Sequence, residues 1–214
     1  MTGASATLAT RLGHVRWIGG GSGAAKSTVA RRLAESRRMR MIDTDATMAD
    51  HARRLSPDDA PALRAFASMS MDERWVERTP QEMLATFHWF LGEGFDLIVE
   101  DLLALPTDAP VLVEGFRLLP RLVAPLLRAP DQAVWLLPTP GFRRQALEAR
   151  GGLWAIAGRT NDPDRALTNL LERDRLFTAR LAEEAADLGL ATIAVDGTTA
   201  EDELVEAVGR ALGL

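Results

Sequence analysis

The chain has 214 residues, of which 47% are hydrophobic and 26% charged, so it is long enough to bury a sizeable apolar core. A net charge of −5 and an isoelectric point near 5.3 argue against a general nucleic-acid binder, which normally carries a basic domain. The sequence has no cysteine, which excludes disulfides, thiol nucleophiles and zinc–thiolate sites and suits the cytoplasm, and no apolar run reaches membrane-spanning length.

Taken in order, the chain alternates short apolar runs with longer helical stretches. Residues 1–13 begin with small, polar side chains and lack a signal-peptide pattern, so we expect a flexible leader. Five apolar runs predict strands, at residues 14–18, 39–42, 111–113, 133–137 and 191–195. Helical spacing and start signals predict helices at residues 27–36, 46–55, 56 onward, 71–75, 80–105 with a break at 92–94, 162–188 and 200 onward.

This alternation predicts an α/β fold, with a five-stranded parallel sheet between two helical layers in a single domain over residues 1–214. Residues 46–106 then form a helical insert between the second and third strands. Residues 140–162 are rich in arginine and interrupted by glycine, which is typical of a mobile lid. Ligands of such sheets bind beyond the carboxyl ends of the strands, so we expect motifs that follow strands to converge there.

A glycine-rich segment follows the first predicted strand and opens the first helix. It fits the phosphate-binding pattern G-x-x-x-x-G-K-[ST], except that alanine stands at the last glycine. The chain contains a single lysine beside its 24 arginines, and it lies in this motif, where a slim ammonium fits better than a forked guanidinium. We expect Lys26 to bind the outer phosphates of ATP and the Ser27 hydroxyl to bind Mg²⁺. The whole predicted phosphate site comprises Gly20, Gly21, Ser22, Gly23, Ala24, Ala25, Lys26, Ser27 and Thr28.

Two carboxylates, Asp43 and Asp45, directly follow the second predicted strand. Alternate residues of an extended chain point the same way, so the two side chains can share a site. One could hold Mg²⁺ through water while the other orients or deprotonates a substrate hydroxyl. The alternative is that Asp45 caps the helix beginning at residue 46 and that Asp43 is solvated.

The phosphate loop followed by Asp-x-Asp resembles the small-molecule P-loop kinases: shikimate kinase, gluconate kinase, chloramphenicol phosphotransferase and the zeta-toxin-like enzymes. The resemblance to shikimate kinases implies Asp43 near Mg²⁺ and Asp45 at the hydroxyl that is phosphorylated. The end of the third strand is similar instead to uridine-kinase-like and nucleotide kinases, where an acid, a glycine and an arginine face the acceptor. It implies that Glu114 and Arg117 bind the acceptor; the alternative is a structural salt bridge between them.

Phosphoryl transfer needs cations on the migrating group, and a closing lid can deliver them. Among the arginines of the lid and the following helix we select Arg143, Arg159 and Arg173, although any one of them could be a surface residue. The segment Asp196-Gly197-Thr198 resembles the loop that holds adenine by backbone contacts in these kinases, and the alternative is a plain turn. Trp89, together with Trp75 and Phe90, forms an apolar acceptor wall or part of the core.

Two further patterns are excluded. Glu100 and Asp101 superficially match the acidic end of a Walker B strand, but the apolar residues after them favour an amphipathic helix, so we predict no Walker B strand. His14, His51 and His88 have no metal-ligand spacing.

The sequence therefore predicts a kinase that transfers the γ-phosphoryl group of ATP, with Mg²⁺, to a hydroxyl of a small molecule. The alternatives are a nucleoside or nucleotide kinase, and a nucleotide-binding regulatory module that has lost transfer activity, with Ala25 as its trace. We expect a cytoplasmic monomer or homodimer with no nucleic-acid polymer or membrane as partner.

Overall fold

The computed structural model describes residues 2–150 and 152–214. Its centre is a sheet of five parallel strands in the order β2-β3-β1-β4-β5. The α/β fold with a five-stranded parallel sheet is confirmed. The strands are β1 (Val15–Gly20), β2 (Arg40–Asp43), β3 (Val111–Glu114), β4 (Ala133–Pro138) and β5 (Ala191–Val195).

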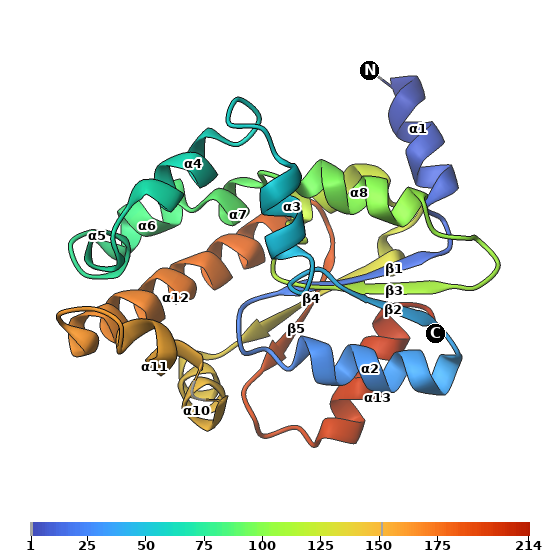
Figure 1. Cartoon of the computed structure of the whole chain (residues 1–214). Coiled ribbons are helices and arrows are strands. Elements are labelled where there is room, and N and C mark those ends of the chain that lie inside the picture. Colours follow the sequence, from blue (N-terminus) through green and yellow to red (C-terminus); the bar gives the residue numbers. More distant parts are fainter. Residues whose placement is uncertain (1, 151) are drawn as a thin grey trace.

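Helices fill every connection (Figure 1). Before and after the first strand lie α1 (Thr2–Arg11) and α2 (Lys26–Arg37). The predicted insert contains α3 (Met48–Arg54), α4 (Pro61–Ser68), α5 (Met71–Trp75), α6 (Pro80–Thr86), α7 (His88–Leu91) and α8 (Phe95–Leu103). The rest are α9 (Pro120–Val123), the 3₁₀ helices η1 (Ala124–Leu126) and η2 (Pro130–Gln132), α10 (Pro140–Arg150), α11 (Gly152–Ala157), α12 (Pro163–Asp187) and α13 (Glu201–Ala211).

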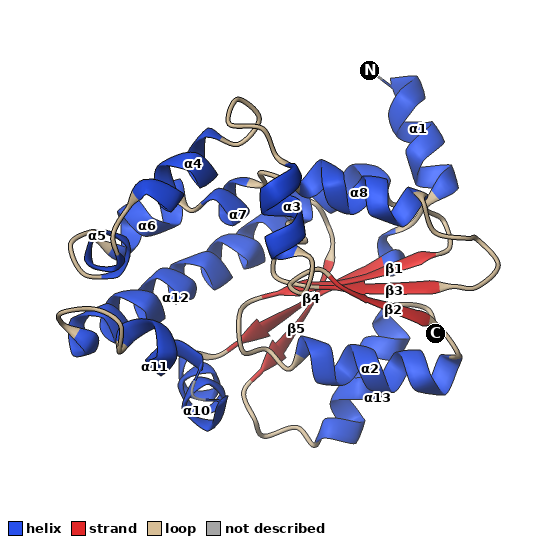
Figure 2. Cartoon of the chain, in the orientation of Figure 1, coloured by secondary structure: helices blue, strands red, loops and turns tan. Residues whose placement is uncertain are grey.

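The helices form a layer on each face of the sheet (Figure 2). Successive residues of β1 point to opposite faces, so Trp17 belongs to the apolar cluster under α8 and α12, and Ile18 to the cluster under α2 and α13. Both side chains are fully buried. The insert helices α4–α7 and the lid helices α10 and α11 lie beyond the carboxyl ends of the strands (Figure 1).

The N-terminal segment differs from the flexible leader predicted for residues 1–13. Residues 2–11 form helix α1, and Met1 lies outside the described residues. Leu12 is fully buried in the main apolar cluster and Leu8 packs against it, which anchors the helix to the body of the protein. The small and polar residues at the start of the chain gave no indication that Leu8 and Leu12 are part of the apolar core.

The helix predicted from residue 56 begins five residues later, at Pro61. The Ser56 hydroxyl and the Asp59 carboxylate bond to each other across a turn before it. The carboxylate of Glu93, from the turn between α7 and α8, accepts the backbone N–H groups of Ala62 and Leu63, both at 2.8 Å. A residue thirty positions away thus caps α4, which no local pattern indicates.

None of the helices within the described residues has the length and apolar character that a membrane span needs. The region 80–105 is interrupted at Gly92 and Gly94, as predicted, because both glycines adopt left-handed backbone angles (φ 94° and 74°). The lid region 140–162 is two helices, with Gly151 between them outside the described residues.

Candidate active site

The phosphate-loop segment connects the C-terminal end of β1 to the first turn of α2, as its motif predicts. Gly20 has φ 135°, and a Cβ there would lie 2.1 Å from the backbone oxygen of Leu136, so only glycine fits beside β4. Lys26 is the first residue of α2 and is 7% exposed; its Nζ donates a hydrogen bond to the Gly21 carbonyl at 2.9 Å. The loop therefore places an ammonium and a helix N-terminus at one point, the arrangement that binds phosphate.

Ala25 adopts the left-handed conformation (φ 60°, ψ 15°) that the motif normally assigns to glycine. An alanine in this region costs about 1 kcal/mol relative to its favoured conformations. Ala25 packs against the apolar cluster under α2, which holds it in this conformation. The alanine therefore strains the backbone but does not change the shape of the phosphate loop.

We expect Ala25→Gly to raise the free energy of unfolding by up to about 1 kcal/mol, because glycine takes φ 60° without strain. Urea denaturation monitored by circular dichroism measures the change. The matched control is Ala24→Gly: Ala24 is buried and has no positive φ, so the same change there should destabilise the protein. If Ala25→Gly lowers the free energy of unfolding, the inference that Ala25 strains the backbone is wrong.

Glu114 ends β3, the strand next to β1, and pairs in register with Ile18 on one side and Asp43 on the other. It is 1% exposed, and neither of its carboxylate oxygens has a hydrogen bond of ordinary geometry. Burial raises the pKa of Glu114; the nearby Ser27 hydroxyl and the charge of Lys26 oppose this shift. Glu114 is thus an acid at the end of the strand beside the phosphate loop, a position that Glu100 and Asp101 do not occupy.

The signal for this assignment was present in the sequence. Residues 111–114 read Val-Leu-Val-Glu, a short apolar strand ending in an acid, whereas residues 97–101, which we compared with Walker B, lie in helix α8 as predicted. What the sequence lacked was the strand order, which puts β3 directly beside β1.

We expect Glu114→Gln to raise the free energy of unfolding near neutral pH by about 1–2 kcal/mol, because it removes a buried charge that lacks hydrogen bonds. The raised pKa means that the folded protein binds this proton more tightly than the unfolded chain, whose carboxyl has the ordinary value of 4.5. Glu114 therefore contributes fully to the free energy of unfolding below pH 4.5, where it is protonated. This contribution is lost as the pH rises through the pKa of Glu114 in the folded protein. Urea denaturation across pH 4–8 should show the Gln variant gaining its advantage as the pH rises; a constant difference would contradict the assignment.

The two aspartates after β2 have different surroundings. One oxygen of Asp43 accepts the backbone N–H groups of Asp45 (2.8 Å) and Ala46 (3.3 Å), which fixes the turn after the strand. Asp45 does not cap the next helix, whose N-cap residue is Thr47. Its Oδ1 is buried without a partner, and burial raises the pKa of Asp45 against the opposing charge of Lys26. Asp43 therefore holds the turn, and Asp45 is the aspartate with a buried carboxylate oxygen that lacks a hydrogen-bond partner.

Gly115 brings the ends of β2 and β3 together. It has φ 152°, and a Cβ there would lie 1.8 Å from Oγ1 of Thr44 and 3.2 Å from Oδ1 of Asp45. Any side chain would push the turn after β2 away from Glu114. Only glycine therefore fits at this point of the chain, where the ends of β2 and β3 converge.

Arg117 is 2% exposed, and the chain itself uses its guanidinium. Nη1 donates to the Thr44 carbonyl (3.2 Å), and Nη2 contacts Nδ1 of His51 (2.9 Å) and the Gly94 carbonyl (3.2 Å). The guanidinium also lies 4.1 Å from the ring centre of Trp89. Burial lowers the pKa of Arg117 to about 10. These contacts favour a structural role for Arg117 over the predicted contact with an acceptor. The alternative salt bridge with Glu114 does not form.

His51 connects Arg117 to the surface of the insert. It is 1% exposed, its Nε2 lies 2.7 Å from Oδ2 of Asp101, and Asp101 in turn binds Arg54 at 2.7 Å. Because Arg117 can only donate, Nδ1 of His51 accepts and Nε2 carries the proton. The sequence analysis missed this residue, since only the distant positions 101 and 117 give it a role.

We expect His51→Leu to lower the free energy of unfolding by about 2–3 kcal/mol, because it leaves a buried guanidinium and a carboxylate each short of one hydrogen bond. Asp101→Asn keeps an oxygen for Nε2 and should cost less than about 1 kcal/mol. Chemical denaturation compares the two, with Asp50→Asn, at an exposed ion pair with Arg53 of the same helix, as the control. Equal effects of the three substitutions would contradict the role of His51.

Two of the three selected lid arginines meet at one buried acid. Arg143 of α10 and Arg173 of α12 both bind Asp174, and all three residues are at most 7% exposed. A side chain at Gly23 would contact Cγ of Arg143 at 3.6 Å, so Arg143 lies against the phosphate loop, while the Arg173 guanidinium lies over the rings of Trp75, Phe87 and Phe90. Nε of Arg143 and Nη1 of Arg173 are buried without partners. Arg159 is exposed at the end of α11 and does not join them.

Asp174 was also missed, although α12 carries a signal for it. Its buried stripe runs through Ala166, Leu170, Phe177 and Leu181, and position 174 falls on that stripe. A carboxylate among apolar residues at helical spacing indicates a buried charge that needs cationic partners.

The segment 196–198 forms a turn in which the Asp196 carboxylate accepts the backbone N–H and the hydroxyl of Thr198, at 2.9 and 2.7 Å. Gly197 has φ 84°, and a Cβ there would lie 2.8 Å from the ring of Phe142 at the start of α10. The turn thus packs against the base of the lid. This agrees with the plain-turn alternative and leaves an adenine contact as a proposal.

Trp75, Trp89 and Phe90 are each at most 7% exposed, so they pack in the interior of the insert. Phe90 stacks on Phe177 of α12 at 3.7 Å, and Trp89 covers Arg117. The geometry favours the core alternative over a wall that an acceptor contacts.

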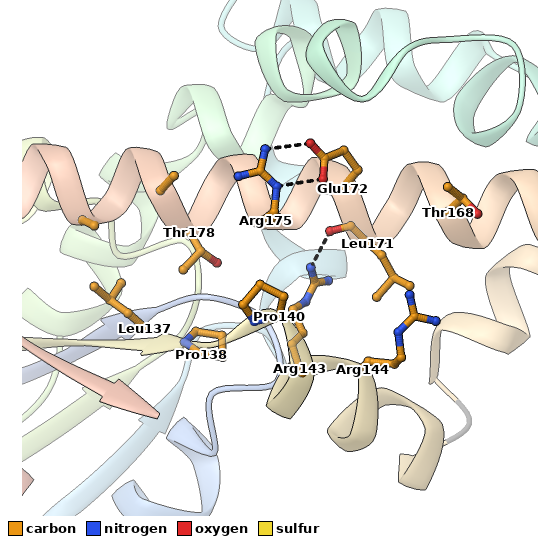
Figure 3. A pocket seen from close by; sticks show the side chains of 13 residues that line it. Leu137, Pro138, Pro140, Arg143, Arg144, Thr168, Leu171, Glu172, Arg175 and Thr178 are labelled. Carbon is orange, nitrogen blue, oxygen red and sulfur yellow. Dashed lines mark hydrogen bonds and ion pairs between the residues drawn. The ribbon is translucent and has the colours of Figure 1, made fainter. Parts of the chain in front are cut away.

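A cavity of about 590 Å³ opens between α10 and α12 (Figure 3). Arg143 and Thr178 line it, together with Leu171, Arg175 and the end of β4 at Pro138. The carboxylates Asp45 and Glu114 and the lysine of the phosphate loop are not among its lining residues. The cavity nevertheless shares Arg143 with the lid, and its lining residues Pro138 and Thr178 lie beside Gly21 of the phosphate loop.

Within the described part of the chain, no three His, Cys, Asp or Glu side chains are arranged to hold a metal ion by themselves. Mg²⁺ at phosphoryl-transfer sites takes only one or two ligands from the protein and the rest from phosphates and water. Glu114, with both oxygens unbonded, and the adjacent Ser27 hydroxyl are hard oxygen donors of the kind that Mg²⁺ prefers, so the residues present fit the ion.

The profile of a protein family described as an AAA domain matches residues 15–153. The chain belongs to this AAA domain family. Members are P-loop NTPase-like and include kinases, so the match supports nucleotide binding at the loop and a kinase-like P-loop protein. A search of curated proteins found no match. The matched range runs from β1 into the lid and includes the phosphate loop, Asp43, Asp45, Glu114, Arg117 and Arg143, but not Arg159, the residues of α12 or the segment 196–198.

Proposed function

We propose that this AAA domain protein is an ATP-dependent phosphotransferase that transfers the γ-phosphoryl group to a hydroxyl of a small molecule. The observation that carries the proposal is the pair of carboxylates, Asp45 and Glu114, whose buried oxygens lack hydrogen bonds of ordinary geometry and lie near Lys26. A protein that only binds nucleotide needs the loop, but it has no need of a second buried carboxylate at such an energetic cost.

In this proposal Lys26 and the backbone N–H groups at the start of α2 bind the phosphates of ATP. Glu114 and Ser27 would hold Mg²⁺, which neutralises charge on the phosphates when bound. This moves the predicted metal role from Asp43, whose carboxylate holds a turn, to Glu114.

Asp45 accepts the proton of the attacking hydroxyl. It lies beside Lys26, and burial raises its pKa, which makes its carboxylate a stronger base than a solvated aspartate. The proton moves from the acceptor oxygen to Oδ1 as that oxygen forms its bond to phosphorus. The bond between phosphorus and the β,γ-bridging oxygen breaks, and ADP leaves.

Arg143 packs its side-chain stem against the phosphate loop, and its guanidinium meets that of Arg173 at Asp174. Since both share Asp174, the three side chains carry a net charge of +1. A net cation at this position stabilises the charge that spreads over the transferring group. The turn 196–198, against the base of the lid, is proposed to contact the adenine.

The test is ADP formation from Mg-ATP with pools of nucleosides, sugars, hydroxy acids and antibiotics, with Lys26→Ala as the control. Turnover that one pool raises and the control abolishes supports the kinase. ATP binding without turnover in any pool would favour the regulatory module, and the Ala25→Gly variant then separates a strained loop from a lost activity. Absence of ATP binding would overturn the proposal.

A further inference from the structure

Most arginines of the helical insert and of the segment up to residue 117 bind groups of the protein itself, whereas an anion-binding surface keeps its arginines available for a ligand. Residues 46–117 contain six arginines and no lysine. Bidentate hydrogen bonds from arginine are a common means of binding a phosphate or carboxylate group on an acceptor, so the availability of these guanidinium groups bears on the charge of the acceptor.

Five of the six arginines are engaged within the chain. Arg117 is held by Thr44, His51, Gly94 and Trp89, as described above. Arg74 donates to the backbone oxygens of Phe66 and Ala67, at 3.0 and 2.9 Å, and covers the Phe66 ring.

The remaining arginines follow the same pattern. Arg78 donates to the Glu82 carbonyl at 3.0 Å and to Thr86. Arg54 is paired with Glu100 and Asp101, and Arg53 with Asp50 on the exposed side of α3. Arg64 lies exposed on α4, in an open cleft that it shares with Asp58.

The charges around Asp45 also disfavour an anion. Asp43 and Glu114 add two further carboxylates, against the positive charges of Lys26 and Arg117. Within the insert, His88 is 3% exposed in an aromatic cluster with Phe66 and Phe87, and burial lowers its pKa to about 4, so the imidazole is neutral. Its Nδ1 has no partner, which leaves an uncharged hydrogen-bonding atom inside the insert.

We propose that the acceptor is an uncharged hydroxyl compound, without a phosphate or carboxylate group for the insert to bind. This inference rests on the proposed phosphotransfer and selects among its acceptors: a nucleoside, sugar or other neutral alcohol is favoured, and a nucleotide is disfavoured. The net positive charge of Arg143, Arg173 and Asp174 serves the transferring group, on the lid side of the phosphate loop.

Matched pairs of acceptors test the inference: a nucleoside and its 5′-monophosphate, a hexose and its 6-phosphate, and a polyol and the corresponding aldonic acid. We expect the uncharged member of the accepted pair to have a kcat/KM at least about 100-fold higher than its anionic counterpart. If the anionic member is equal or better, the inference is overturned while the proposed phosphotransfer stands.

A binding measurement decides the inference even where no pair is phosphorylated. Equilibrium dialysis measures the binding of orthophosphate and of AMP to the full chain saturated with a non-hydrolysable Mg-ATP analogue. We expect no site with a dissociation constant below about 1 mM beyond that of the analogue. A tighter site that Arg117→Met removes, but the surface variant Arg64→Met retains, would overturn the inference. Failure of the analogue to bind at all would instead refute the proposed function, and dialysis of phosphate with the same two variants would still decide between the charged and uncharged acceptor.

Discussion

Asp45→Asn lowers kcat for phosphoryl transfer by about 10³-fold and leaves ATP binding within about twofold, because it removes a positioned base while leaving the phosphate loop intact. Asparagine has the same shape as aspartate but cannot accept the proton of the hydroxyl. Steady-state kinetics with the identified acceptor and calorimetric titration of a non-hydrolysable ATP analogue measure the two quantities separately.

The matched control is Asp43→Asn. Its amide oxygen can still accept the N–H groups of Asp45 and Ala46, so the turn remains and kcat should fall less than about tenfold. If Asp43→Asn is the more damaging substitution, the roles that we assign to the two aspartates are reversed. In the wild-type protein, kcat falls as the pH decreases through the pKa of Asp45. Burial raises that pKa, so the fall begins at a higher pH than for an ordinary aspartate with a pKa of 3.8.

Lys26→Ala weakens both nucleotide binding and phosphoryl transfer. We expect nucleotide affinity to fall by at least about tenfold and kcat/KM by about 10³-fold. The ammonium is nearly buried, and its hydrogen bond to the Gly21 carbonyl fixes it across the loop. Binding of a fluorescent ATP analogue and ADP release measure the two losses.

Lys26→Arg separates charge from shape. The guanidinium keeps the positive charge but is too wide for a site that is 7% exposed, so we expect less than a tenth of wild-type kcat/KM. Recovery to near wild-type activity would mean that charge alone is required, and that the single lysine among 24 arginines has no structural reason.

The fold was largely predictable because its signals are local. The ends of the strands lie within two residues of their predicted bounds, since each strand is a short apolar run between turn residues. The phosphate loop was predictable for the same reason: its glycines, lysine and serine are consecutive.

The parts that sequence could not provide depend on contacts between distant positions. Glu93 sets the start of α4 from thirty residues away, and His51 gains its role from Asp101 and Arg117. From the sequence, Arg117 resembles a residue that binds a ligand. In the structure its guanidinium is held by partners from three separate segments, which no local pattern indicates. The role of Glu114 likewise required the strand order.

The contacts of Arg117 also determine which parts of the protein can move separately. One guanidinium joins the turn after β2, helix α3 and the turn between α7 and α8, so the insert and the Asp45 carboxylate behave as a single rigid body. Closure over the nucleotide then has to come from the other side, where α10 leaves β4 through Pro138, Thr139 and Pro140. Gly141 follows as the second residue of α10, with open space around its Cβ position. We therefore expect a hinge at one end of the site and a fixed platform at the other, with the acceptor entering before the lid swings shut.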